Sequence, residues 1–174
     1  MATKYNFEFN LSERSINELT RNLQNYHRDL KLAKNYILEA LADFTMEEVK
    51  KNIADTTSPG TSTGTLLSSI KKSPILNDTI RIYTDLAYAK FVEYGTGIVG
   101  AGATHPKASE AGWVYDKNEH GERGWVYMGP DGEFHWTAGQ EGHQFMYRAL
   151  ETLKSKYMEI ARKVLRERGL IKWI

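Results

Sequence analysis

The segment Gly60–Gly64 (GTSTG) has the pattern Gly-x-Ser-x-Gly, which in hydrolases places a nucleophilic serine, here Ser62, on a sharp strand-to-helix turn. The flanking sequence does not fit such a turn, because a helical pattern ends near Asp55 and Pro59 stands in the approach. The glycine spacing also differs from that of a phosphate-binding loop, and no lysine follows. We therefore interpret residues 56–65 as a Thr/Ser/Gly loop and keep a Ser62-dependent hydrolase as an alternative.

The ionisable side chains show no other catalytic or metal-binding pattern. Zinc sites need three or four suitably spaced ligands, and no close ligand pair occurs among the histidines. These are His27, His105, His120, His135 and His143. Glu93 lies in an apolar and aromatic setting, but no second carboxylate at a defined spacing supports acid–base chemistry. We favour a turn cap or an interface pair for Glu93, and we expect no enzyme activity, no metal and no cofactor.

The composition predicts one globular domain of residues 1–174. Apolar residues make up 41% and charged residues 26%, while 23 Lys and Arg nearly balance 22 Asp and Glu. The net charge of +1 favours neither nucleic acid nor a membrane as a partner. The absence of cysteine excludes disulfides and thiolate metal sites, and no apolar run approaches the ~20 residues that span a bilayer. The basic residues after Lys154 leave DNA contact as a minor alternative, with a steep salt dependence.

The elements that would position these residues follow from hydrophobic periodicity. Residues 4–10 alternate as in a strand, and Ser12 is placed to cap a helix whose apolar positions follow at spacings of three and four. A second helical stretch extends to residue 53, and the two stretches are expected to meet around residues 27–32. A hairpin is predicted around Asn77-Asp78, with strands over 72–76 and 79–84. The last helix carries apolar residues from Met146 to Val164, and Gly169 is its expected stop.

Aromatic residues concentrate in the segment 98–137, which we interpret as an inserted loop followed by a β-meander. Its runs are 113–115, 125–127 and 134–136, separated by turn-rich sequence. So small a meander cannot bury three indoles alone, and interfaces favour tryptophan and tyrosine. The overall prediction is an α+β fold, in which a small antiparallel sheet packs against long N-terminal helices and a long C-terminal helix.

Several segments, taken in order, resemble one family. Thr63–Ile70 (TGTLLSSI) and Ala87–Thr96 (AYAKFVEYGT) are the most specific, and Ile16–Leu19 and Gln144–Ala149 resemble its first and last helices. This is the tail-component (gene-product-ten-like) family of long-tailed bacteriophages, which is distantly similar to lambda minor tail protein Z. Gln144 stands where members often have proline, and the aromatic meander is longer than the minimal family pattern.

The resemblance implies a structural virion protein at the head–tail interface, acting in tail completion or head–tail joining and assembled in the host cytoplasm. It implies a ring, with sixfold symmetry the usual tail arrangement, and neighbouring neck, connector or tail-tube proteins as partners. A minor capsid or neck protein at another position is the alternative within the same class. Our candidate interface residues are Tyr88, Glu93, Tyr94, Gly95, Thr96, Gly97, Trp113, Trp125, Trp136, Phe145 and Trp173.

Overall fold

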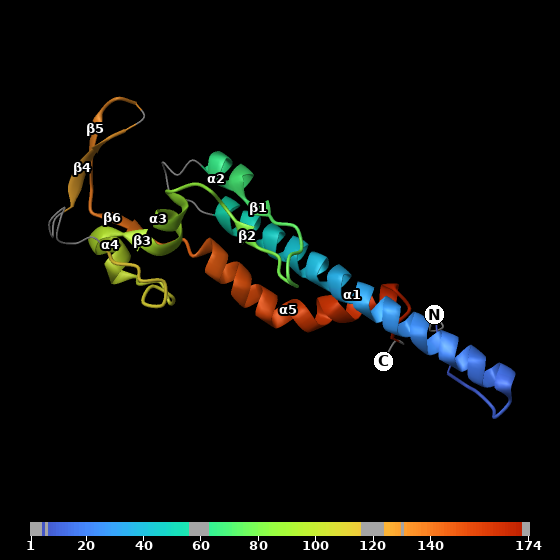
Figure 1. Cartoon of the computed structure of the whole chain (residues 1–174). Helices are drawn as coiled ribbons and strands as arrows, with labels where there is room; N and C mark the ends of the chain where they lie inside the picture. Colours follow the sequence, from blue (N-terminus) through green and yellow to red (C-terminus); the bar gives the residue numbers. More distant parts are fainter. Residues whose placement is uncertain (1–4, 6, 56–62, 116–123, 130, 172–174) are drawn as a thin grey trace. The chain divides into compact units, whose positions relative to one another are not determined.

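The computed structural model describes residues 5, 7–55, 63–115, 124–129 and 131–171. By its internal contacts the chain forms two compact units, shown in Figure 1 as parts of one cartoon. Unit 1 comprises residues 1–47, 72–82 and 151–174, and unit 2 comprises residues 48–71 and 83–150. The two longest helices, α1 (Glu13–Ala54) and α5 (Phe145–Glu167), contribute residues to both units. The predicted α+β class, with small antiparallel sheets, is confirmed.

Helix α1 begins where its sequence predicts. The Ser15 amide donates to the Ser12 Oγ at 3.3 Å, and Glu13 lies in the first turn, where the helix dipole favours a negative charge. The helix then runs without interruption through residues 27–32, so the two predicted stretches are one element. No Gly or Pro occurs between Glu13 and Ala54, so no residue type that breaks helices interrupts it.

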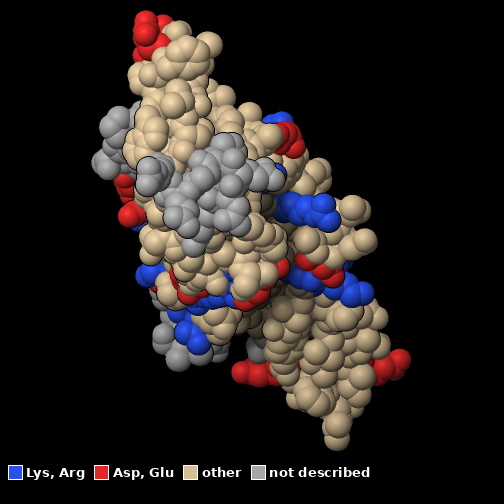
Figure 2. Space-filling view, turned by 90° about the vertical axis from the view of Figure 1, so that its left-hand side faces the viewer, with Lys and Arg blue, Asp and Glu red and all other residues tan. Residues whose placement is uncertain are grey.

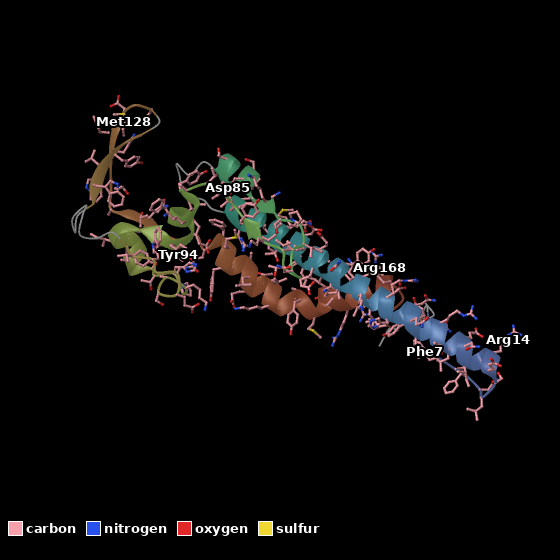
Figure 3. The ribbon with its side chains drawn as sticks, viewed as in Figure 1. Phe7, Arg14, Asp85, Tyr94, Met128 and Arg168 are labelled. Atoms are coloured by element: carbon pink, nitrogen blue, oxygen red, sulfur yellow. The ribbon has the colours of Figure 1, made fainter. Side chains whose placement is uncertain are left out.

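The predicted N-terminal strand is wrong for the described residues of that segment. The ring of Tyr26 on α1 meets Tyr5 and Phe7 edge-to-face, with centroids 5.4 and 5.5 Å away, and the Tyr5 hydroxyl donates to Asp29. Tyr5 and Phe7 thus contact a helix instead of a neighbouring strand, and Phe7 stays 41% exposed. Figure 3 shows Phe7 beside the first turns of α1.

The predicted hairpin around Asn77-Asp78 is confirmed. Leu76 and Thr79 exchange both backbone hydrogen bonds at 3.0 Å, and Asn77 and Asp78 have φ of 48° and 58°. Two successive positive φ angles define the type I′ turn, which Asn and Asp tolerate and which matches strand twist. The ladder continues to the short strands β1 (Lys71–Lys72) and β2 (Ile82–Tyr83).

The core of unit 2 is built on short elements. They are α2 (Thr63–Ser69), α3 (Ala89–Tyr94), β3 (Gly95–Thr96), α4 (Gly97–Gly102) and β6 (Gly139–Glu141). Strand β3 pairs antiparallel with β6, and the most deeply buried large side chains are Val49, Ile53, Leu66 and Phe145. Two predicted loops therefore differ from the structure, since α2 begins at Thr63 and α4 occupies the start of the predicted loop 98–112.

Two of the three predicted meander runs are strands. Strands β4 (Trp125–Met128) and β5 (Phe134–Thr137) pair antiparallel over four residues each. In Figure 1 they form an arm that extends away from α3, α4 and β6. The first run, 113–115, is not a strand, because the Trp113 indole docks on the core and its Nε1 donates to the Gly95 carbonyl at 3.2 Å. The meander is thus a two-stranded hairpin.

Helix α5 ends as predicted at Gly169. The Gly169 amide donates to the Arg166 carbonyl at 2.9 Å and the Leu170 amide to the Leu165 carbonyl at 2.9 Å. Gly169 has a φ of 68°, the left-handed conformation that glycine adopts most readily. This is a Schellman-type stop, which satisfies the last carbonyls of the helix.

Candidate assembly site

The carboxylate of Glu93 closes the N-terminus of α5. One oxygen, Oε2, accepts from the Met146 amide at 2.8 Å, and Oε1 accepts from the Tyr147 amide at 2.9 Å. The first amides of a helix have no intrahelical partners and carry the positive end of its dipole, so a carboxylate stabilises them. Only 6% of Glu93 is exposed. The expectation was a turn cap or an interface pair; in the structure Glu93 instead caps the N-terminus of the last helix.

His105 completes this buried cluster. Its Nδ1 accepts from the Lys107 amide at 2.9 Å, so the ring proton lies on Nε2, which donates to the Glu93 Oε1 at 3.1 Å. The His105 amide in turn donates to the Tyr115 hydroxyl at 2.7 Å. Three donors therefore hold the Glu93 carboxylate in place. This arrangement joins α3, α5 and the segment after α4, and it positions elements rather than a reacting group.

The residues just before α5 are fixed to α3 as well. The His143 amide donates to the Val92 carbonyl at 2.7 Å and the Gln144 amide to the Glu93 carbonyl at 3.1 Å. Gln144 has a φ of 53°. Proline has a φ near −65° and no amide proton, so it would fit neither the conformation nor the hydrogen bond. The departure from the proline that family members often carry here therefore agrees with this backbone.

Glycines allow the backbones of β3 and β6 to approach each other closely. Gly95 has a φ of 83°, and a Cβ there would lie 2.6 Å from the Gly142 nitrogen and 2.7 Å from the Gln140 oxygen. At Gly97, with a φ of 62°, a Cβ would lie 2.4 Å from the Ala138 oxygen. Real Cβ atoms do not come so close to backbone atoms, so only glycine fits at these two positions.

An aromatic recess lies beside this junction. We define it by Lys90, Phe91, Tyr94, Thr96, Trp113 and Val114, and its volume is about 570 Å³. Tyr94 stacks on Trp113 with centroids 5.2 Å apart, and Phe91 meets the same indole edge-to-face at 5.5 Å. Burial, and secondarily the charge of Glu93, raise the pKa of the Tyr94 hydroxyl above its usual value. The recess is thus an aromatic surface with an uncharged floor and a lysine at its edge.

The structure brings most of the candidate interface residues together in unit 2. Glu93, Gly95, Gly97 and Phe145 are buried, and Tyr94, Thr96 and Trp113 are partly exposed around them. Tyr88 precedes α3, and its buried hydroxyl has no hydrogen-bond partner among the described residues. Trp125 and Trp136 lie on the β4–β5 arm, whereas Trp173 and Ser62 lie outside the described residues.

Sequence analysis missed His105 and Tyr147 as members of this site. The two rings meet edge-to-face with centroids 5.3 Å apart, and His105 also contacts Tyr94 at 4.4 Å. His105 lies twelve positions after Glu93, and no single periodicity extends across the residues between them, which include β3 and α4. A single histidine in a Gly/Ala-rich segment has no sequence pattern that would identify partners so far along the chain.

A comparison with protein families gives one match, which covers part of this site. Residues 17–95 match the model of a family described as "Bacteriophage HK97-gp10, putative tail-component". This part of the chain is similar to phage tail components. The resemblance predicted from the sequence is confirmed over this range, which includes Glu93 and Gly95, whereas the segment Gln144–Ala149 lies outside it. No curated protein and no solved structure matches the chain significantly.

Two further properties of the described residues concern membranes and metals. None of the helices in the described part of the chain is long and apolar enough to cross a membrane. Within the same residues, no three His, Asp or Glu side chains are grouped so that they could hold a metal ion.

His143 gives the site a predicted pH dependence. Burial, and secondarily Arg148, lower the pKa of its imidazole below 6.5, against an opposing effect of Glu141. The unfolded chain therefore binds this proton more readily, and stability is lost as the pH falls from 6.5 toward the folded-state pKa. Urea midpoints measured from pH 7.5 to 5 should decrease, and H143Q should weaken this decrease. H27Q, on an exposed face of α1, is the matched control and should leave it unchanged.

Proposed function

We propose that the protein is a structural virion protein of a tailed phage, which completes the tail or joins it to the head as part of a ring. The observation that carries this proposal is the family match over residues 17–95, which ends within the motif around Glu93. In the structure this motif fixes the start of α5 through the Glu93 carboxylate, and it forms the β3–β6 junction through Gly95 and Thr96. Such a site supports assembly better than catalysis.

A ring would give each subunit distinct contact surfaces for its two neighbours. Heterologous contacts that repeat around an axis close into a ring, and six copies would match the usual symmetry of phage tails. The partners would be copies of the same chain and, above and below them, neck, connector or tail-tube proteins. The site of action is the virion.

A deletion in the phage or prophage that encodes the chain tests the proposal. Particles made without this gene should contain separate heads and tails in electron micrographs, and their infectious titre should fall to background. A plasmid copy of the wild-type gene should restore joined, infectious particles. Joined and infectious particles in the deletion strain would refute the joining role.

The S62A variant, expressed from the same plasmid, separates assembly from hydrolysis. A structural protein does not need the serine hydroxyl, so S62A should restore the titre as well as the wild type does. Loss of rescue by a variant that still enters the particle would favour the hydrolase alternative. Immunogold labelling of the rescued particles then distinguishes the head–tail junction from another position in the capsid or neck.

A further inference from the structure

The β4–β5 arm carries an uncovered apolar face. Val126 and Met128 lie on one side of β4, and their partners across the ladder, Trp136 and Phe134, point to the same side. Their exposed fractions are 59%, 65%, 62% and 73%. The opposite face is more polar, since it carries His135 and Thr137 besides Trp125 and Tyr127. One face of the arm is therefore made entirely of large apolar side chains in contact with water.

An isolated two-stranded hairpin is marginally stable in water and needs a further packing surface. In Figure 1 the arm extends from the rest of unit 2, and Figure 3 places Met128 on it, well apart from Tyr94 at the aromatic recess. Within one copy, the apolar face and the recess therefore do not cover each other. Exposed apolar groups of this kind mark sites of protein association.

The recess has the size and chemistry to receive this face. A volume of about 570 Å³ falls within the range of pockets that enclose drug-sized groups, which is enough for one or two large side chains. Its Phe91 and Trp113 rings offer edges and faces to incoming aromatic side chains. Phe91 is 42% exposed and Val114 is 80% exposed, so the recess itself has apolar surface to bury.

The charges of the two surfaces are complementary. The tip of the arm carries Asp131 and Glu133, both exposed, and in Figure 2 the upper end of the molecule is tan apart from acidic side chains at its top. A backbone hydrogen bond from Glu133, and then His135, lower the pKa of Asp131, so this carboxylate stays ionised at neutral pH. The recess carries Lys90, whose Nζ lies 5.6 Å from the centre of the Phe91 ring. An acidic tip would therefore meet a basic edge.

We propose that the apolar face of the arm of one copy packs into the aromatic recess of the next copy. This inference rests on the proposed ring function, and it names the surfaces that link the copies. The arm and the recess are different patches of the same unit, so the contact is heterologous and repeats in one direction around a ring. It also assigns a role to the long aromatic insertion, which lies outside the matched segment 17–95.

Cysteine cross-linking tests the contact directly, because the chain contains no cysteine. We would purify the full chain as two single variants, F134C on the arm and V114C in the recess, and oxidise each alone and the two as an equimolar mixture. The mixture should give a disulfide-linked dimer with one chain of each variant. The double variant F134C/V114C should give a ladder of multimers up to the ring size, both in solution and in particles that it has rescued.

Other results would overturn the proposal. Dimers from F134C alone would show arm-to-arm pairing, and a double variant that cross-links only within one chain would show closure inside a copy. Absence of cross-links in both solution and particles would assign the face to a different partner. The pair Y127C/V114C, with the arm cysteine on the opposite face of the β4–β5 hairpin, is the matched control and should cross-link far less.

An affinity measurement complements the cross-linking. Central aromatic residues of interfaces commonly contribute 2 kcal/mol or more, so W136T should weaken self-association about 30-fold in sedimentation experiments. Threonine keeps the β propensity of the strand, and Y127T on the other face should leave the affinity within a few fold. K90E should also weaken association, and E133K in the partner should restore part of it. Equal effects of W136T and Y127T would refute the assignment of the face.

The outcomes for the contact and for the function are separable. If deletion particles are unjoined but the cysteine pairs do not cross-link, the function stands and the contact is wrong. If the pairs cross-link but deletion particles are joined and infectious, the contact stands and the joining role is wrong.

Discussion

Replacing Glu93 by alanine is expected to lower the free energy of unfolding by about 3–5 kcal/mol. The substitution removes the acceptor of the Met146 and Tyr147 amides and of the His105 ring, and these donors are then left without that partner. Hydrogen bonds to charged groups contribute about 1.5–3 kcal/mol each, and buried donors without partners add their own cost. A cavity of four heavy side-chain atoms and the loss of a favourable charge at the α5 N-terminus act in the same direction.

Urea denaturation followed by circular dichroism and by tryptophan fluorescence would measure this loss. Trp113 lies in unit 2 beside Tyr94, so its fluorescence should report on the region that loses its anchor. E93Q should fall between the wild type and E93A, because an amide keeps one acceptor oxygen but turns donors toward the helix amides. E110A is the matched control, since Glu110 makes an exposed ion pair with Lys107, and it should change stability by less than about 1 kcal/mol. A loss for E93A no larger than for E110A would contradict the anchoring role.

The features that sequence analysis predicted well are those encoded over a few residues. The Ser12 cap, the Asn77-Asp78 turn and the Gly169 stop each depend on side chains within about six positions of the backbone that they control. Their chemistry is local, because a hydroxyl, a positive φ angle or a missing Cβ acts on its own turn. Helix periodicity likewise predicted that α1 and α5 form, but apolar side chains of the predicted faces, such as Leu23 on α1 and Tyr157 on α5, are half exposed.

The features that were missed or wrong depend on partners far along the chain. Glu93 and the α5 amides are separated by 53 and 54 residues, and nothing in their immediate surroundings specifies the pairing. The predicted strand at residues 4–10 and the first meander run failed for a related reason. Aromatic residues that alternate along the chain can pack on a sheet or on another surface. Here Phe7 packs on the ring of Tyr26 in α1, and Trp113 packs on Tyr94.

Gly95→Ala is expected to destabilise the protein by about 2–6 kcal/mol. Gly95 has φ 83° and ψ 171°, a conformation that is essentially restricted to glycine and costs other residues about 1–3 kcal/mol. The new Cβ would also lie 2.6 Å from the Gly142 nitrogen and 2.7 Å from the Gln140 oxygen. Both neighbours are backbone atoms of a paired segment, so neither can rotate away, and overpacking of this kind adds about 1–3 kcal/mol.

Gly102→Ala is the matched control for this prediction. Gly102 ends α4 in the same unit, and a Cβ there would meet nothing within 4 Å. Alanine favours helices over glycine by up to about 1 kcal/mol, so G102A should leave stability unchanged or slightly higher. Urea midpoints of both variants, measured beside the wild type, test the contrast. Equal midpoints for G95A and G102A would show that the β3–β6 backbones can separate at little cost. The Gly-Thr-Gly sequence would then not be required by this junction, and its role would have to lie in contacts with other chains.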